Sequence, residues 1–174
     1  MTSRFSASAA GMVIAAVLII PVAASATAAA APWCGTDSVS LSAGGPGSPG
    51  DGQQSHFDLI LTNTSSQSCA LKGYPGVDLL GPDDPTWGPD YQLPQQAGDP
   101  RLLTLAPGAS ASSRLTFLPD PNGWAPDTIA VTLPNASGRL KTDWPGSPGN
   151  GIPLARQDGA THPGTYIGPL QLSQ

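Results

Sequence analysis

The sequence predicts an all-β fold: an immunoglobulin-like antiparallel β-sandwich of seven to nine short strands with long Pro/Gly loops. Short apolar runs recur along the chain, and proline and glycine separate them. The 174 residues include 21 glycines and 20 prolines, 11% are charged, and none is glutamate. Because proline and glycine interrupt helices and glutamate favours them, we expect no long amphipathic helix.

The start of the chain has the organisation of a secretory signal peptide. One positive charge precedes the apolar run 11–20, and small residues around Ala26 suit cleavage. The predicted domains are therefore a signal peptide over residues 1–31 and a single β-sandwich domain over residues 32–174. We expect a secreted, extracytoplasmic protein with no membrane span after cleavage. An uncleaved anchor is the alternative, because residues 7–32 are long enough to span a bilayer.

Alternation of apolar and polar residues predicts the strands of the N-terminal half. In the clearest case Phe57, Leu59 and Leu61 share one face, and His56 lies on the other. Asn63 and the residues after it favour a turn, because Asn and Ser side chains bond to their own backbone. The expected strands of this half cover residues 38–42, 56–62, 69–71 and 77–80, and residues 91–93 are a candidate for a short edge strand beside the loop over 81–90.

The C-terminal half continues the same pattern. Pro107 and Gly108 predict a type II turn between two strands, and residues 120–123 predict another turn. The expected strands cover residues 102–105, 112–118, 128–133, 139–141 and 166–172. The long Pro/Gly loops are expected over residues 44–52, 81–90 and 144–151.

Cys34 and Cys69 are predicted to form a disulfide. They are the only two cysteines, and export would place them in an oxidising compartment, where thiols usually pair. A bridge that closes a loop of this length, about 35 residues, stabilises a fold by roughly 3–4 kcal/mol in the chain-entropy model. A reactive thiol is the alternative, but the chain has no C-x-x-C motif and neither cysteine has basic neighbours.

The charge of the chain argues against polyanionic partners. The net charge is −5, and the 7 lysines and arginines form no cluster in the sequence. Nucleic acids and anionic lipid surfaces are bound through local positive charge, so we expect the protein to bind neither.

Few residues suggest catalysis, and the sequence predicts that the protein is not an enzyme and uses no cofactor or metal. With both cysteines paired, His56 and His162 lack the further ligands that a zinc or copper site needs. No Gly-x-Ser-x-Gly motif supports a serine nucleophile. Asp83 and Asp84 suit a turn better than a calcium site, which needs several oxygen ligands at fixed spacing.

Three aromatic residues, Trp87, Tyr91 and Trp144, are expected in loops rather than in alternating strands. Loop aromatics can form a binding platform, since they offer a large contact area at a low entropy cost. They can also cap the ends of a sandwich core. Both interpretations stay open, and these three are the candidate binding residues.

Three stretches resemble a known family. They are Leu-x-Leu-Thr-Asn-Thr-Ser over residues 59–65, Cys-Ala-Leu-Lys-Gly-Tyr-Pro-Gly-Val over residues 69–77, and Leu-Ala-Pro-Gly-Ala-Ser-Ala over residues 105–111. Together they resemble an actinobacterial (mycobacterial-type) secreted family of domains of unknown function, number forty-two thirty-two. The resemblance implies a small extracytoplasmic β-sandwich, often associated with the cell envelope, without an established activity or ligand. Members commonly carry two further cysteines, and their absence here leaves Cys34 and Cys69 to pair with each other.

The predicted function is therefore a secreted or cell-envelope, non-catalytic structural or binding module. Its partner would be an envelope glycan or an envelope protein. One alternative is an envelope hydrolase that uses a loop Asp or His. Another is a protease-inhibitor-like module that presents a stiff loop, for which residues 44–52 and 144–151 are the candidates.

Overall fold

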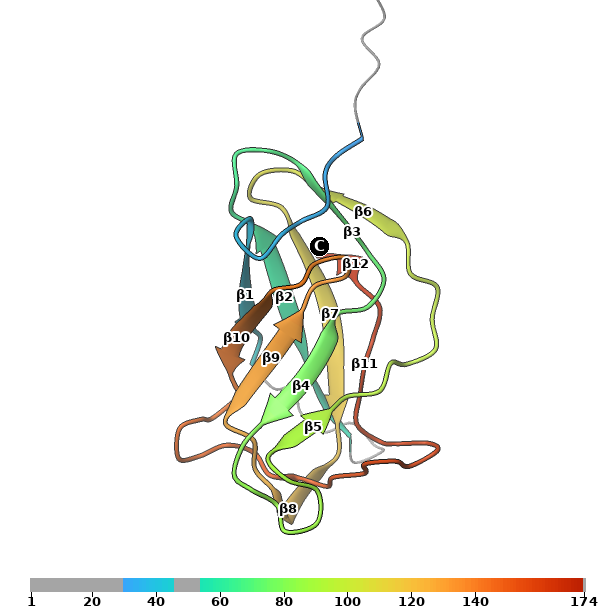
Figure 1. The fold of residues 1–174 in the computed structure, drawn as a ribbon. Helices are drawn as coiled ribbons and strands as arrows, with labels where there is room; N and C mark the ends of the chain where they lie inside the picture. The colour runs from blue at the N-terminus through green and yellow to red at the C-terminus, as the bar shows by residue number, and fades with distance from the viewer. Residues whose placement is uncertain (1–29, 46–53, 174) are drawn as a thin grey trace, which may run out of the picture.

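A computed structural model of the chain describes residues 30–45 and 54–173. Nearly all of the expected signal peptide and most of the loop over residues 44–52 lie outside the described residues. All regular elements in the described part of the chain are β-strands, and every strand ladder in it is antiparallel (Figure 1). The predicted all-β fold is confirmed.

Two sheets face each other as a sandwich. The first has the order β1-β2-β7-β11, with β12 also paired to β7, and the second has the order β10-β9-β4-β5. The strands of the first sheet are β1 (Val39–Ala43), β2 (Ser55–Asn63), β7 (Ser110–Phe117), β11 (Tyr166–Ile167) and β12 (Gln171–Leu172). Those of the second are β4 (Gly76–Leu80), β5 (Asp90–Gln92), β9 (Thr128–Thr132) and β10 (Arg139–Asp143).

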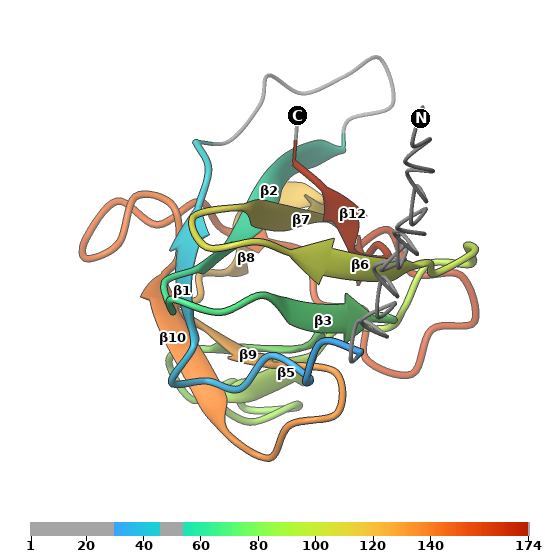
Figure 2. The ribbon, with the colours of Figure 1, turned by 90° about the horizontal axis from the view of Figure 1, so that it is seen from above.

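A smaller pair of strands lies at one end of the sandwich. It consists of β3 (Cys69–Lys72) and β6 (Leu102–Leu105). Seen from above, β3 and β6 lie between the two sheets in projection (Figure 2). A further strand, β8 (Pro119–Trp124), lies at the opposite end, where both of its ends form isolated bridges to Leu154.

The alternation predicted for β2 is confirmed. Phe57, Leu59 and Leu61 are buried, whereas His56 and Asp58 on the other face are partly exposed. In the register with β7, Phe57 lies opposite Leu115, so the inward positions of the two longest strands coincide. Because successive side chains of a strand point to opposite faces, this register places both apolar sets in the core.

The core consists of two clusters. One is aromatic, and its centre is the contact of Phe57, Phe117 and Trp144, whose ring centroids lie 5.1–6.0 Å apart. Tilted and edge-on aromatic pairs of this kind stabilise a fold beyond simple area burial. The other cluster surrounds Cys34 and Cys69 and is filled mainly by leucines and other aliphatic side chains.

The expected number of strands was too low, since the described residues form twelve strand segments. One difference is β8, whose residues were expected to form a turn. The other is the predicted terminal strand over 166–172, which is divided into β11 and β12. Pro169 lies in the break, and a proline has no N–H to give to a sheet ladder.

The turn predicted at Pro107 and Gly108 is confirmed. The Ala109 N–H donates to the Ala106 carbonyl at 2.9 Å, and Gly108 has a φ of 79°, as the third position of a type II turn requires. The two strands that it joins do not pair with each other, because β6 pairs with β3 and β7 with β2. The turn therefore carries the chain from the small strand pair into the first sheet.

Candidate binding site

The three aromatic residues predicted for binding lie in different environments. Trp144 has 1% of its surface exposed and belongs to the aromatic core, so its prediction as a loop platform was wrong. It follows β10 directly, and its backbone N–H donates to the Asp127 carbonyl while its indole N–H donates to the Ile152 carbonyl. Those contacts direct the ring inward.

Tyr91 is also buried, with 2% of its surface exposed. It is the central residue of β5 and lies opposite Leu79, so the alternation of a three-residue strand turns it toward the core. Burial raises the pKa of its hydroxyl; the Gln157 backbone and the Thr165 side chain lie near that hydroxyl and act in the opposite direction, although neither forms a hydrogen bond of full geometry with it. Tyr91 is therefore not an exposed loop aromatic, although it is one of the residues that line a hollow of about 610 Å³.

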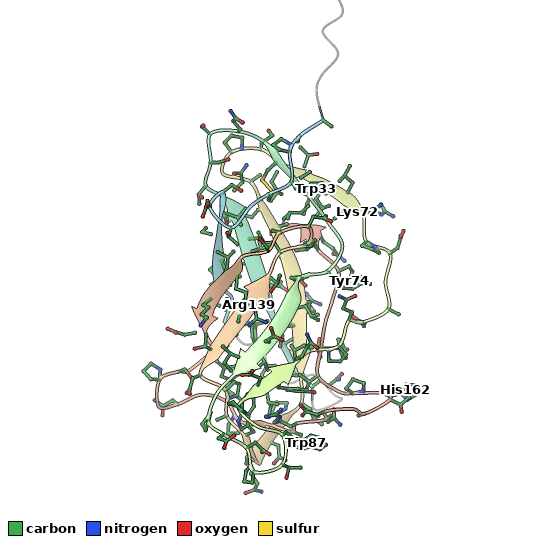
Figure 3. The ribbon with its side chains drawn as sticks, viewed as in Figure 1. Trp33, Lys72, Tyr74, Trp87, Arg139 and His162 are labelled. Atoms are coloured by element: carbon green, nitrogen blue, oxygen red, sulfur yellow. A yellow bond between two sulfur atoms is a disulfide. The ribbon has the colours of Figure 1, made fainter. Side chains whose placement is uncertain are left out.

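Trp87 is the one of the three that reaches the surface, with 51% of its surface exposed (Figure 3). It lies in the loop between β4 and β5, beside a hollow of about 470 Å³. We call this hollow the Trp87 groove. Its lining comes from that loop, from β8 and from the segment after Leu154: Asp83, Asp84, Pro85, Thr86, Trp87, Asp120, Asn122, Gly123, Trp124, Ala155 and Arg156.

Asp84 shapes the loop that carries Trp87. One of its carboxylate oxygens, Oδ1, accepts the backbone N–H groups of Thr86 at 2.8 Å and Trp87 at 2.9 Å. The Gly88 N–H donates back to the Asp84 carbonyl, with Gly88 at a φ of 74° that favours glycine. The two N–H bonds from Thr86 and Trp87 lower the pKa of Asp84, because they stabilise its charged form.

Trp124 holds the same loop from the side of β8. Its indole N–H donates to the Pro82 carbonyl at 2.7 Å. The ring packs so closely on Gly81 that a Cβ there would lie 2.8 Å from a ring carbon, which real side chains do not tolerate. Glycine at position 81 is therefore required for this close approach.

Arg156 links the β4–β5 loop to Trp124 of β8, and it was not among the residues predicted for the site. Only 3% of its side chain is exposed. Its guanidinium forms an ion pair with Asp158 at 2.7 Å and stacks over the rings of Trp124 and Tyr91, at 4.7 and 5.3 Å from the ring centroids. It also donates to the Trp87 and Gly88 carbonyls of the β4–β5 loop and to the carbonyl of Asp90, the first residue of β5.

No sequence signal points to Arg156, because it stands in a polar segment without periodicity and the carbonyls to which it donates lie more than sixty positions earlier in the chain. A planar guanidinium with five N–H donors suits this role, since it can bond several carbonyls and stack on a ring at once. The result is a braced loop that presents a half-exposed indole.

Another hollow, of about 610 Å³, lies beside β4 and β5 of the second sheet. The start of β4, residues 91–95 and residues 157–163 contribute to its lining. Tyr91 is the one aromatic residue of its lining and is itself buried, so no half-exposed ring borders this hollow. We therefore take the Trp87 groove as the stronger candidate.

The two histidines lie apart from the groove lining. His56 stands on the outward face of β2, and His162 is exposed in the segment before β11 (Figure 3). Within residues 30–45 and 54–173, neither histidine has a hydrogen bond or ion pair with a carboxylate. The same residues contain no group of three or more His, Cys, Asp or Glu side chains placed to hold a metal ion.

The predicted disulfide is confirmed. Cys34 and Cys69 are joined, with Cα atoms 4.9 Å apart, and no cysteine of the described residues is free. The Cys34 N–H donates to the Ala70 carbonyl and the Ala70 N–H to the Pro32 carbonyl, so residues 32–34 lie against the edge of β3. Neither cysteine is thus available as a reactive thiol.

Comparison with known proteins assigns the chain to a family. A family model described as "Domain of unknown function (DUF4232)" matches residues 34–164. The chain belongs to this family. The resemblance to the family of this number, inferred from three motifs, is thereby confirmed. No curated protein and no solved structure matches the chain. In the described part of the chain, no helix is long and apolar enough to cross a membrane.

Proposed function

We propose that this family member is a non-catalytic, extracytoplasmic binding module that takes its ligand in the Trp87 groove. The observation that carries the proposal is the indole of Trp87, half exposed on a loop that Asp84, Trp124 and Arg156 brace. An exposed aromatic ring with few freely rotating bonds contributes contact area at little entropic cost, and bracing lowers that cost further.

Export to an oxidising compartment is supported by two features. The chain begins with a sequence of the secretory type, and its two cysteines form a buried disulfide. Disulfides persist outside the cytoplasm and are rare within it. A cell-envelope or fully secreted location follows as part of the proposal.

A non-catalytic role is favoured over the hydrolase alternative. That alternative relied on a loop Asp or His, yet no hydrogen bond or ion pair among the described residues pairs His56 or His162 with a carboxylate. General acid–base work needs a base within hydrogen-bond reach of its partner. The inhibitor alternative is supported less, because Ser147 in the loop 144–151 donates to the Pro126 carbonyl and holds the loop back against the domain.

The test is a retention experiment on envelope extract with immobilised protein and two matched variants. Trp87→Ala removes the groove indole, and Trp33→Ala removes an equally exposed indole, 50% exposed, that does not line the groove. We expect Trp87→Ala to lose specific retention of envelope components and Trp33→Ala to keep it, as measured by mass spectrometry. Equal retention by both variants would exclude the Trp87 groove as the binding site.

A further inference from the structure

We propose that the Trp87 groove recognises a cationic group, the ammonium or guanidinium of a lysine- or arginine-bearing peptide segment. The inference rests on the proposed function and deepens it by assigning a ligand class to the same site. It is based on the charge, the hydrogen-bonding groups and the aromatic face that meet around one hollow of about 470 Å³.

The charge of the groove is negative, because its carboxylates outnumber its one cationic side chain, Arg156, whose charge also helps to lower the pKa of Asp84. Three carboxylates line it, those of Asp83, Asp84 and Asp120. The one cationic side chain of its lining, Arg156, is already paired with Asp158, which is not part of the lining. A ligand with positive charge therefore complements the groove, and the net charge of −5 draws such a ligand toward the protein as a whole.

The hydrogen-bonding groups of the groove are mainly acceptors. Asp84 Oδ1 accepts two backbone N–H groups of its own loop and Asp120 Oδ1 accepts one within β8, which leaves Oδ2 of both residues for a ligand. The donors of Arg156 are directed to Asp158 and to loop carbonyls. An ammonium or guanidinium carries donors only, so it fits an acceptor-rich lining better than a neutral sugar, whose hydroxyls both donate and accept.

The aromatic face supports the same ligand. Cations are attracted to the face of an indole, and tryptophan is the best of the aromatic side chains for this contact. The groove already contains one such pair, because the guanidinium of Arg156 stacks on Trp124 at 4.7 Å. Trp87 offers a second, open indole beside the carboxylates.

A peptide side chain matches this geometry better than a small free cation. Lysine and arginine combine an apolar stem with a charged head, and such stems lie along apolar surface while the head stays with polar partners. The stem would cover the half-exposed Trp87 ring, and the head would reach the Asp83 and Asp120 carboxylates on the groove walls.

The test is calorimetric titration of the purified protein with three probes. They are an acetylated oligolysine peptide, an oligoglutamine peptide of the same length and a neutral N-acetylglucosamine oligomer. Each is titrated at ionic strengths of about 0.01 M and about 1 M, which shortens the Debye length from about 30 Å to about 3 Å. We expect oligolysine alone to bind, and to bind at least several-fold more weakly at the higher ionic strength.

Two pairs of variants locate the binding. Asp83→Asn with Asp120→Asn removes two charges but keeps the oxygen that Asp120 uses for its own turn, and we expect about 3- to 10-fold weaker binding of oligolysine. Its control is Asp37→Asn with Asp99→Asn, which removes two exposed charges outside the groove. Trp87→Ala should weaken binding about 2- to 5-fold, and Trp33→Ala should leave it unchanged.

The outcomes separate the ligand class from the site. If the sugar oligomer binds with the same affinity at both ionic strengths, and if Trp87→Ala weakens that binding, the groove is a binding site but the cationic inference is overturned. Equal affinity for oligolysine and oligoglutamine also overturns it, as does an equal loss in the two double-aspartate variants. If no probe binds, or if Trp87→Ala and Trp33→Ala respond alike, the inference fails together with the groove as a site.

Discussion

Each end of the sandwich is stabilised by a different kind of interaction. At one end, residues 32–34, β3 and β6 are linked by the Cys34–Cys69 disulfide, and we call this the disulfide end. At the other, the β4–β5 loop, β8 and the segment after Leu154 meet around Arg156, and we call this the groove end. Each end carries one half-exposed tryptophan, Trp33 or Trp87 (Figure 3).

The comparison shows what each kind of link can do. A disulfide acts mainly on the unfolded chain, whose entropy it reduces, and it needs no extended set of native contacts. The Arg156 network acts only in the folded state and depends on each of its partners being in place. The disulfide therefore adds stability to its end, whereas Arg156 adds stability and also sets where the Trp87 indole lies.

The largest effect is expected from removing the disulfide. Cys34→Ser with Cys69→Ser opens a loop with a sequence separation of 35 residues. The free energy of unfolding should fall by about 3–4 kcal/mol, because the unfolded chain regains the loop entropy. Urea denaturation in oxidising buffer measures this. A loss below about 1 kcal/mol would mean that the disulfide is not a main source of stability at the disulfide end.

An intermediate effect is expected from removing the charge at the centre of the groove end. Arg156→Met breaks the ion pair, three carbonyl contacts and two ring contacts, and leaves Asp158 without its partner. The free energy of unfolding should fall by about 2–3 kcal/mol. The emission of Trp87 should also shift as its loop loosens, which fluorescence at low denaturant measures.

The matched control is Arg114→Met. Arg114 also forms an ion pair, with Asp58 at 3.4 Å, but 62% of its side chain is exposed. Exposed pairs contribute little, so the expected loss is below about 0.5 kcal/mol. If the two arginine variants lose equal stability, Arg156 does not act as a buried brace.

The smallest effect is expected from the titration of Asp84. Its pKa is lowered by the N–H bonds from Thr86 and Trp87, so its charged form supports the loop. A lowered pKa means that this support is fully present above the ordinary value of 3.8 and is lost as pH falls through the lowered value. The backbone amide signal of Trp87 in an NMR titration should therefore change only below that ordinary pKa.

Two variants test whether Asp84 causes this change of the Trp87 amide signal. Asp84→Asn keeps an acceptor oxygen but cannot be protonated in this range, so it should abolish the acid-induced change. Asp83→Asn removes a neighbouring charge that makes neither backbone bond and should leave it in place. A transition of the wild-type signal above pH 3.8 would contradict the assignment to Asp84.

Much of the core of the first sheet and of the disulfide end could be predicted from the sequence. The alternation of β2, the turn at Asn63 and the pairing of Cys34 with Cys69 are all local patterns or follow from a count of two cysteines. The Asn63 side chain goes further than predicted, since it also donates to the Leu105 carbonyl across the fold. The local Asn/Ser pattern nevertheless predicted the turn at Asn63 correctly.

The groove end was predicted only in part. Trp87 was placed correctly in a loop, but Tyr91 and Trp144 are not exposed loop aromatics. The alternation of a three-residue strand directs Tyr91 toward the core, and hydrogen bonds to the Asp127 and Ile152 carbonyls hold Trp144 there. Residue type and loop composition do not reveal whether a side chain points into the core. Trp124 and Arg156 were not recognised, because their roles exist only in contacts with residues far away in sequence.

The sequence by itself determined the β-class, the alternating core strands, the disulfide and the family, because each depends on local periodicity or on a distinctive motif. The tertiary structure alone decided which aromatic rings are buried and that Asp83, Asp84, Asp120 and Trp87 surround one hollow. The physical reason is that a guanidinium has no preferred partner until folding brings carbonyls and rings within its reach. Arg156 gains those partners from loops that the two sheets hold in place.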